Sequence, residues 1–315
     1  MRAAGEACWR LMAASILSFI SIPLLAEQVS IPGTSVSMEA PAGFSVSKSF
    51  SGLVNPADGS NIMIAELPAA DYPKLAALFS DLAAVKREFA RQNFSIERTQ
   101  NVMVGGKAVP MIVGTQPDPA GTLGKYAAVL QGGTTVLITF NVFDARNLTQ
   151  EIVERTISSV SLAPPLTLQQ KLDQLPFSFD AVTPFRVYSV VLGVSAGLTA
   201  AEAGTQPTVS KPLMLISRAK GGLPADVAPA VLARQLIHRV NGFEKAEVTV
   251  SKPTMFAGVD GIYMEATVDA RKVVQYLAVR GGDELVHLVA YGTMAELDSA
   301  MAAVSTIAES VAVRK

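Results

Sequence analysis

The sequence contains one pattern twice, about 150 residues apart, and this repeat constrains the fold more than any other feature. In the first copy, an apolar run, the pair Gly132-Gly133 and a second apolar run follow one another. In the second copy, Gly281-Gly282 stands between two such runs. A Gly-Gly pair in this position indicates a β-hairpin, because a type I′ turn needs positive φ at both central residues. The sequence therefore predicts two related units.

Three earlier pairs of segments match in the same order and at nearly the same spacing. They are Asn61–Ile64 with Pro212–Leu215, Gln92–Phe94 with Val240–Phe243, and Val104–Ala108 with Phe256–Gly261. Between the copies lies Ala163-Pro164-Pro165-Leu166, where two prolines end the regular structure of the first copy. We therefore expect one unit over residues 27–163 and a second over residues 164–315, as a tandem duplication.

Each copy also contains an amphipathic helical pattern between its strands. In the first copy a helix beginning near Asp71 has apolar residues along one face, namely Leu75, Leu78, Phe79, Leu82, Val85 and Phe89. Its counterpart begins near Asp226 and carries Pro229 in its first turn, where proline is tolerated. The pattern predicts one long helix in each copy.

A second helix is expected at the end of each copy. Thr293 and Glu296 have the spacing of a capping box, and Asn147 and Gln150 form a similar pair in the first copy. Hairpins followed by helices favour an antiparallel sheet over a doubly wound parallel one. We therefore predict an α+β fold with two tandem α/β/α sandwiches, each a mainly antiparallel sheet flanked by helices.

Residues 1–26 have the pattern of a secretory signal peptide. Arg2 and Arg10 flank a short positive region, and the apolar run Leu11–Leu25 that follows it is shorter than the roughly 20 residues of a spanning helix. Ala26 is a small residue at the expected cleavage site. We expect an exported protein, periplasmic or secreted; the alternative is an uncleaved segment that anchors it in the membrane. The single cysteine, Cys8, lies in this segment, so the rest of the chain can form no disulfide.

Composition argues against several classes of function. A formal net charge of −1 and a pI of about 6.2 provide no basic surface for nucleic acid. His238 and His287 are the two histidines, which is too few for a Cys/His zinc site, and no calcium-loop spacing occurs. We expect no metal, no cofactor and no nucleic-acid partner.

One motif resembles a catalytic element. Gly193-Val194-Ser195-Ala196-Gly197 follows an apolar run, as the Gly-x-Ser-x-Gly nucleophile elbow of α/β-hydrolases follows a strand. In such an enzyme Ser195 would be the nucleophile, Asp260 or Asp269 the acid, and His287 the base.

The context of the motif argues against this hydrolase hypothesis. No His-Gly-Gly oxyanion segment precedes it. The repeat places the motif in an insertion near residues 192–210, and it places His287 in a hairpin strand, at about the position of Ile138. We therefore interpret the motif as a loop of small residues and expect no catalytic residue.

The pattern resembles the PsbP-like family, which includes the DcrB-like exported proteins of bacteria. The resemblance rests on the opening strand and turn Ser37–Phe44, on the next strand Ser60–Glu66, and on the helices and hairpins that follow in the family's order. The second copy departs from it, because Val182–Phe185 stands where the Pro-Ala-Gly-Phe turn stood. The resemblance implies a helix/sheet/helix sandwich that acts as a binding or assembly module. The family has no shared catalytic residues, so the resemblance implies none for this chain.

The expected function is an exported, non-enzymatic binding or assembly module of the cell envelope. Its partner would be an envelope protein or a small ligand that the sequence does not identify. Two alternatives stay open: a serine hydrolase that uses Ser195, and a carrier that holds an apolar ligand in a gap between the two units.

Overall fold

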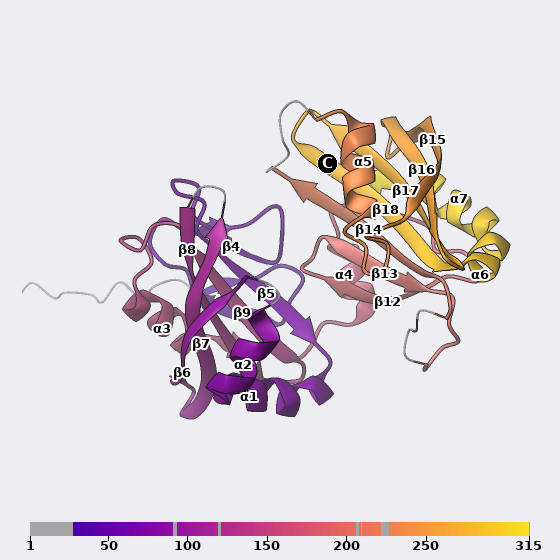
Figure 1. Ribbon diagram of the computed structural model, residues 1–315. Coiled ribbons are helices and arrows are strands. Elements are labelled where there is room, and N and C mark those ends of the chain that lie inside the picture. Colours follow the sequence, from indigo (N-terminus) through magenta and orange to yellow (C-terminus); the bar gives the residue numbers. More distant parts are fainter. Residues whose placement is uncertain are drawn as a thin grey trace, which may run out of the picture.

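The computed structural model describes residues 28–90, 93–118, 121–205, 208, 210–221 and 227–314. The predicted signal segment and the predicted helix start at Asp226 lie outside these residues. The described chain forms two similar halves, each with a seven-stranded antiparallel sheet and helices on its faces (Figure 1). The predicted α+β class with two sandwich-like halves is confirmed. We call β1 to β10 the first half and α4 to β19 the second half.

The first half contains one large and one small sheet. Its large sheet is built from β3 (Ser45–Val46), β4 (Gly52–Val54), β5 (Asn61–Leu67), β6 (Ser95–Val104), β7 (Lys107–Asp118), β8 (Gly121–Gln131) and β9 (Thr135–Val142). Its small sheet consists of β1 (Gln28–Ser30), β2 (Val36–Glu39) and β10 (Ser161–Leu162). Its helices are η1 (Ala69–Asp71), α1 (Tyr72–Ser80), α2 (Leu82–Phe89) and α3 (Gln150–Ser158).

The second half begins with the short helix α4 (Leu168–Asp173), which the sequence analysis did not predict. Its large sheet is built from β12 (Arg186–Val191), β13 (Ser195–Thr199), β14 (Leu213–Lys220), β15 (Glu247–Phe256), β16 (Val259–Val268), β17 (Arg271–Arg280) and β18 (Glu284–Thr293). The short strands β11 (Phe177–Ser178) and β19 (Ala312–Val313) pair with each other. Its helices are α5 (Pro229–Ile237), α6 (Met294–Ser299) and α7 (Met301–Ser310).

The two large sheets have the same strand order. The first runs β3-β4-β5-β9-β8-β7-β6 and the second runs β12-β13-β14-β18-β17-β16-β15, with every neighbouring pair antiparallel. The helices also occupy the same places in the order, since α1 and α2 precede β6 as α5 precedes β15. The segment Ala163–Leu166 lies between β10 and α4.

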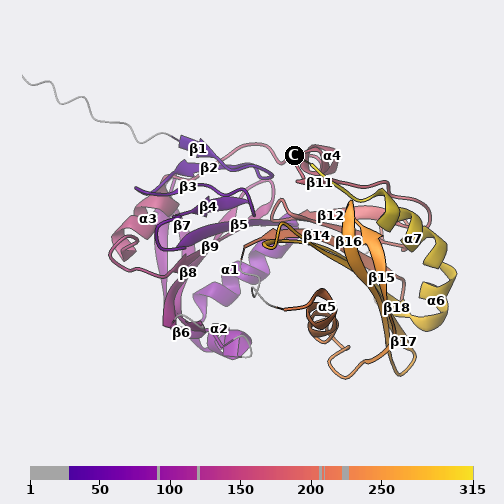
Figure 2. The ribbon, with the colours of Figure 1, turned by 90° about the horizontal axis from the view of Figure 1, so that it is seen from above.

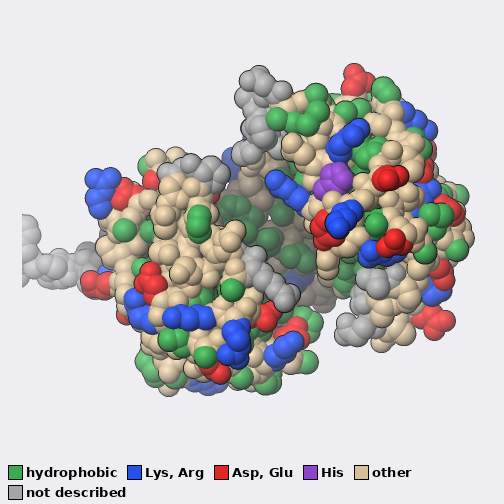
Figure 3. Space-filling model, in the orientation of Figure 1, with side chains coloured by type: hydrophobic (Ala, Val, Ile, Leu, Met, Phe, Trp, Pro, Cys, Tyr) green, Lys and Arg blue, Asp and Glu red, His purple; other side chains and the backbone are tan. Residues whose placement is uncertain are grey.

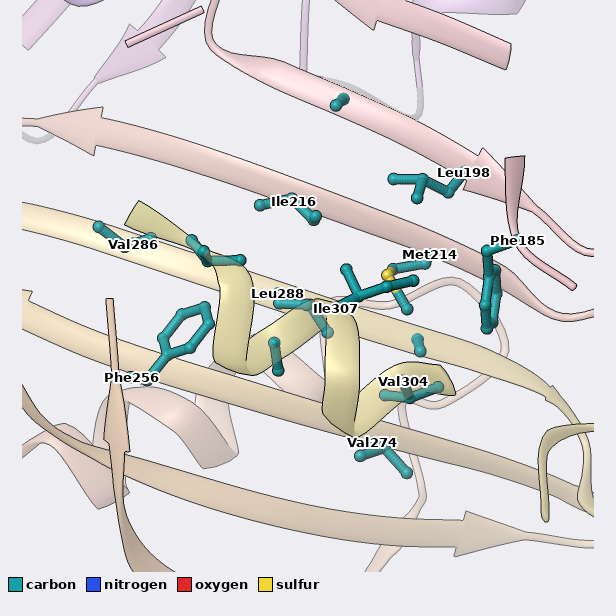
Figure 4. Close-up of a cluster of buried hydrophobic side chains, with 14 of the residues drawn as sticks. Phe185, Leu198, Met214, Ile216, Phe256, Val274, Val286, Leu288, Val304 and Ile307 are labelled. Atoms are coloured by element: carbon teal, nitrogen blue, oxygen red, sulfur yellow. The ribbon is translucent and has the colours of Figure 1, made fainter. Parts of the chain in front are cut away.

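Each sheet buries apolar side chains on both faces. In the second half, Val304 and Ile307 of α7 pack against Met214 of β14 and Leu288 of β18, all at most 2% exposed (Figure 4). The opposite face packs against α5 through a separate cluster that includes Ile237. The first half repeats this arrangement, with α3 on one face of its sheet and α1 and α2 on the other. The alternation of side chains along the strands supplies both faces.

The long helix predicted near Asp71 is two helices. Asp81 has an extended backbone, with φ −109° and ψ 102°, so it ends α1 and begins α2. Its carboxylate accepts hydrogen bonds from the backbone amides of Ala83 and Ala84, at 2.9 and 3.0 Å. An aspartate at this position satisfies amides that a new helix leaves unpaired. The apolar spacing continues across the break, which is why the periodicity did not reveal it.

Two capping predictions have different outcomes. Thr293 caps α6 as expected, because its hydroxyl accepts from the amide of Glu296. In the first half the N-cap is Thr149, whose hydroxyl accepts from the amide of Ile152, and Asn147 lies outside the helix. Threonine and asparagine are both good N-caps, so the sequence alone did not choose between them.

The predicted insertion near residues 192–210 is wrong in its first part. Ser195–Thr199 forms β13, which pairs with β12 on one side and β14 on the other. This strand takes the position that β4 takes in the first sheet. Small residues hid the strand, because Ser, Ala and Gly have low β-propensity. No helix among the described residues is long and apolar enough to span a membrane.

Candidate binding surface

Three of the four candidate residues of the hydrolase hypothesis lie on different strands of the second sheet, and the fourth, Asp269, lies in the exposed turn between β16 and β17. Ser195 opens β13, and β14 separates it from His287 on β18. Two strand spacings put the backbones of Ser195 and His287 about 10 Å apart. Asp260 is exposed on β16, on the far side of β17 from His287. The chain continues from Ser195 into a strand, where a nucleophile elbow would continue into a helix.

The imidazole of His287 is buried and hydrogen-bonded within the second half. Its Nε2 lies 2.9 Å from Oε1 of Gln275 on β17, and Nε2 of Gln275 donates to the carbonyl of Ala233 on α5 at 2.6 Å. The side chain therefore points toward α5, whereas Ile138 points toward the α3 face of the first sheet. The predicted equivalence of these two residues is wrong by one position. Burial lowers the pKa of the His287 imidazole to about 4.

An unusual feature of the second sheet is that, among the described residues, a helix covers only part of one face. The helix α5 packs on β16 and β17, at the outer part of the sheet. Strands β12 and β14, with β13 between them, continue beyond α5 toward the first half, and no helix of the described residues lies over them on this side (Figure 2). The hollow between the two halves opens on this side, and Figure 3 shows hydrophobic side chains at its back.

Three large side chains of this face are exposed to solvent: Tyr188 (40%), Val191 (43%) and Leu215 (38%). The strand register puts them together. Val191 pairs with Ser195, which pairs with Ser217, and Gly197 pairs with Leu215. Directly paired residues point to the same side of an antiparallel sheet. We call Tyr188, Val191 and Leu215 the apolar patch.

A β-bulge and a glycine position the tyrosine of the patch. The register between β12 and β13 shifts between Val187 and Ser189, so Tyr188 is the extra residue. A Cβ built on Gly197 would lie 3.0 Å from two atoms of the Tyr188 ring, so the ring covers this glycine. The absence of a side chain at Gly197 therefore leaves room for this ring and for the Ser189 hydroxyl, which would lie 2.6 Å from the same Cβ.

The patch contains little charge. Ser195, Ser217 and Gly197 lie among its members and carry none. Arg186 points to the same side from the start of β12, but its guanidinium donates to the carbonyls of Ala201 and Glu202 at 2.9 and 2.6 Å. Such a surface suits an apolar partner, and the described residues of these three strands offer no free cation on this side for a phosphate. No cluster of metal-binding side chains occurs within the described residues.

Sequence reasoning missed this patch. The apolar runs Val187–Leu192 and Pro212–Leu215 lie largely within β12 and β14. A nearly continuous apolar run indicates that both faces of a strand avoid water, but it does not say which helix covers which strand. The periodicity of the sequence also did not reveal the β-bulge at Tyr188.

Comparisons with known proteins give no family. The sequence matches no protein-family model and no curated protein. Among solved structures it is similar to LpqN of Mycobacterium tuberculosis, described as involved in cell envelope biogenesis, with 15% identity over 44% of this chain and 83% of that one and a TM-score of 0.34.

Two further solved structures are similar. PsbP (CyanoP) from Synechocystis sp. PCC 6803 matches with 15% identity over 42% of this chain and 94% of that one, at a TM-score of 0.27. The apo immunity protein TplEi of the T6SS of Pseudomonas aeruginosa matches with 11% identity over 91% and 96%, at a TM-score of 0.36. The PsbP-like resemblance predicted from the sequence thus recurs among structural neighbours. Because these TM-scores are below 0.5, no functional conclusion follows from them.

Proposed function

We propose that the chain is an exported, non-enzymatic module of the cell envelope that binds an apolar segment of a protein partner on the apolar patch. The observation that carries this proposal is the exposure of Tyr188, Val191 and Leu215 on a part of the sheet that no helix of the described residues covers. Export is supported by the signal-like pattern of residues 1–26. The similarity of the halves supports an origin by duplication, with the boundary at residues 163 and 164.

The chemistry of the patch favours a protein over other partners. A nucleic acid or an anionic membrane surface is bound through free lysine and arginine side chains, which this face lacks among its described residues. Tyrosine is enriched at protein interfaces, because its ring adds apolar area and its hydroxyl tolerates water.

The patch can supply a useful part of a binding free energy. Full burial of one such side chain contributes about 1.5–3 kcal/mol, and close to two fifths of each side chain remains to be buried. Together the three would contribute about 2–4 kcal/mol, or up to roughly several hundredfold in affinity. A partner must add contacts of its own around this centre, and the hollow between the halves offers walls for them.

The two alternatives have less support. For the hydrolase, Ser195 lies two strands away from His287, and the imidazole is already bound to Gln275. For the carrier, the ligand would have to lie in a gap between the halves, and ligand pockets have volumes of roughly 300–1,000 Å³. The cleft that is lined by residues of both halves is about 180 Å³ and includes the polar side chains of Lys48 and Gln174.

The test is photo-crosslinking in cells that produce the protein. A benzophenone amino acid at position 215 should give discrete protein adducts, and Tyr188→Glu should reduce them. The matched control is the same photo-crosslinker at Met255, which is 64% exposed on the outer edge strand β15. If position 215 gives no adduct, or gives the same adducts as position 255, the patch is not a docking surface.

A further inference from the structure

The two halves of the described chain do not share a hydrophobic core. Each of the four clusters of buried apolar residues contains residues of one half alone, among the residues that the structure describes. Polar interfaces between domains permit relative motion, whereas large apolar ones suppress it. The arrangement of the halves must therefore depend on the polar contacts between them.

The central polar contact is an ion pair between Glu66 and Lys171. Glu66 is the second-last residue of β5 in the first half, and Lys171 lies on α4 of the second half. Their side chains are only 3% and 13% exposed, and Nζ of Lys171 lies 2.5 Å from Oε2 of Glu66. The other carboxylate oxygen, Oε1, accepts from the amide and hydroxyl of Ser35, at 2.7 and 2.6 Å.

The charged form of Glu66 is held by these donors. Burial raises the pKa of this carboxyl, but the hydrogen bonds from Lys171 and Ser35 outweigh burial, and its pKa lies below the ordinary value. The two Ser35 donors fix the carboxylate within the first half. Lys171 is therefore the movable partner, because its half can shift relative to the first.

The helix that carries Lys171 is firmly attached to the second half. After α4, the chain enters β11, which pairs with β19 at the C-terminal end. The amide of Arg314 donates to the carbonyl of Pro176 at 2.9 Å, and its guanidinium donates to the carbonyls of Asp173 and Leu175. Displacement of Lys171 therefore requires displacement of the second half.

Two smaller contacts flank the ion pair. The amide of Gly33 donates to Oε1 of Gln174 at 2.5 Å, and the amide of Ser51 donates to the carbonyl of Leu192 at 2.6 Å. Leu192 lies in the turn of the β12–β13 hairpin, directly after Val191 of the apolar patch. A cleft of about 180 Å³ remains beside these contacts, lined by residues of both halves that include Lys48 and Gln174. The hairpin that carries part of the patch is thus also a point of contact with the first half.

We propose that the Glu66–Lys171 pair is a latch that holds the two halves at one angle and so sets how open the apolar patch is to its partner. The part about the partner rests on the proposed function; the latch itself does not. When the pair is broken, Gly33–Gln174 and Ser51–Leu192 remain as two single hydrogen bonds, and the halves rotate about the segment between β10 and α4.

The test measures the distance between the halves in the full-length chain without any partner. Nitroxide labels are attached at Lys74 on α1 and Val231 on α5, both exposed, in a background with the single cysteine, Cys8, replaced by serine. Double electron–electron resonance should give one narrow distance distribution. Glu66→Gln and Lys171→Met should each broaden or shift it, and the double variant should add nothing further.

The matched control is Glu296→Gln, which breaks the exposed Lys211–Glu296 pair within the second half and should leave the distribution unchanged. Circular dichroism checks that each variant is folded. An unchanged distribution in folded Glu66→Gln and Lys171→Met would overturn the latch. Unfolding of both variants would also overturn it, because the pair would then be needed for folding. Failure of crosslinking at position 215 would affect only the proposed function.

Discussion

Replacement of His287 by glutamine should remove a defined part of the acid sensitivity of the second half. The imidazole is 9% exposed, and its hydrogen-bond partner is the neutral amide of Gln275, whose Oε1 lies 2.9 Å from Nε2. Burial lowers its pKa from 6.5 to about 4. Glutamine is uncharged at every pH used and can still donate to Oε1 of Gln275.

The magnitude follows from the shift in pKa. The difference of about 2.5 units, at 1.36 kcal/mol per unit, corresponds to about 3 kcal/mol. Because the folded pKa is lowered, the unfolded chain binds more protons between pH 6.5 and pH 4. The stabilisation is therefore complete above pH 6.5, declines as the pH falls toward 4, and levels off below it. In His287→Gln this decline should be absent.

The assay must follow the second half alone, because a chain of two halves need not unfold in one step. Protein equilibrated in urea at pH 4 to 7.5 is given a short pulse of deuterium at one common pH. Exchange is read on peptides from β17 and β18. The wild type should lose about 3 kcal/mol more stability than His287→Gln between pH 7.5 and pH 4. If the stabilities of the wild type and His287→Gln change with pH in parallel, the reasoning is refuted. A constant difference in stability between them would report only a change in packing.

Three other predictions concern single positions. Asp81→Ala should lower the stability of the first half by about 1 kcal/mol, measured as faster exchange in peptides of α1 and α2, because the amides that begin α2 lose their cap. Gly193→Ala should speed exchange around Ser51 in the first half. Its φ is +63° and the added Cβ would lie 2.6 Å from the Ser51 hydroxyl; unchanged exchange would mean that the hairpin does not press on the first half. A fluorophosphonate probe should not label the wild type; labelling that Ser195→Ala abolishes would instead establish the hydrolase.

Much of the fold could be predicted because its signals are local. Gly281 and Gly282 have φ of 55° and 81°, as the predicted type I′ hairpin needs. The other predicted pair, Gly132-Gly133, has no positive φ, yet it still connects two antiparallel strands. The prediction of a hairpin was correct in both copies, because the flanking apolar runs determine which strands pair, whatever the type of turn.

The surface and the junction could not be predicted from local signals. Glu66 and Lys171 are 105 residues apart, and each is an ordinary charged residue in its own segment. Their proximity depends on how the two halves pack. Leu215 likewise stands in a normal strand pattern, and its exposure depends on α5 covering β16 and β17 but not β14. Sequence periodicity reports which side chains avoid water, not which element lies over them.

Hydroxyl-radical footprinting tests the docking surface most directly. The protein is oxidised once after purification and once inside the cells that produce it, and mass spectrometry measures modification of each side chain. We expect Tyr188, Val191 and Leu215 to react in the purified protein and to be protected in cells. The exposed Met103 and Met255, at 55% and 64%, should react equally in both and serve as internal controls. Equal modification of the apolar patch in both samples would contradict the account.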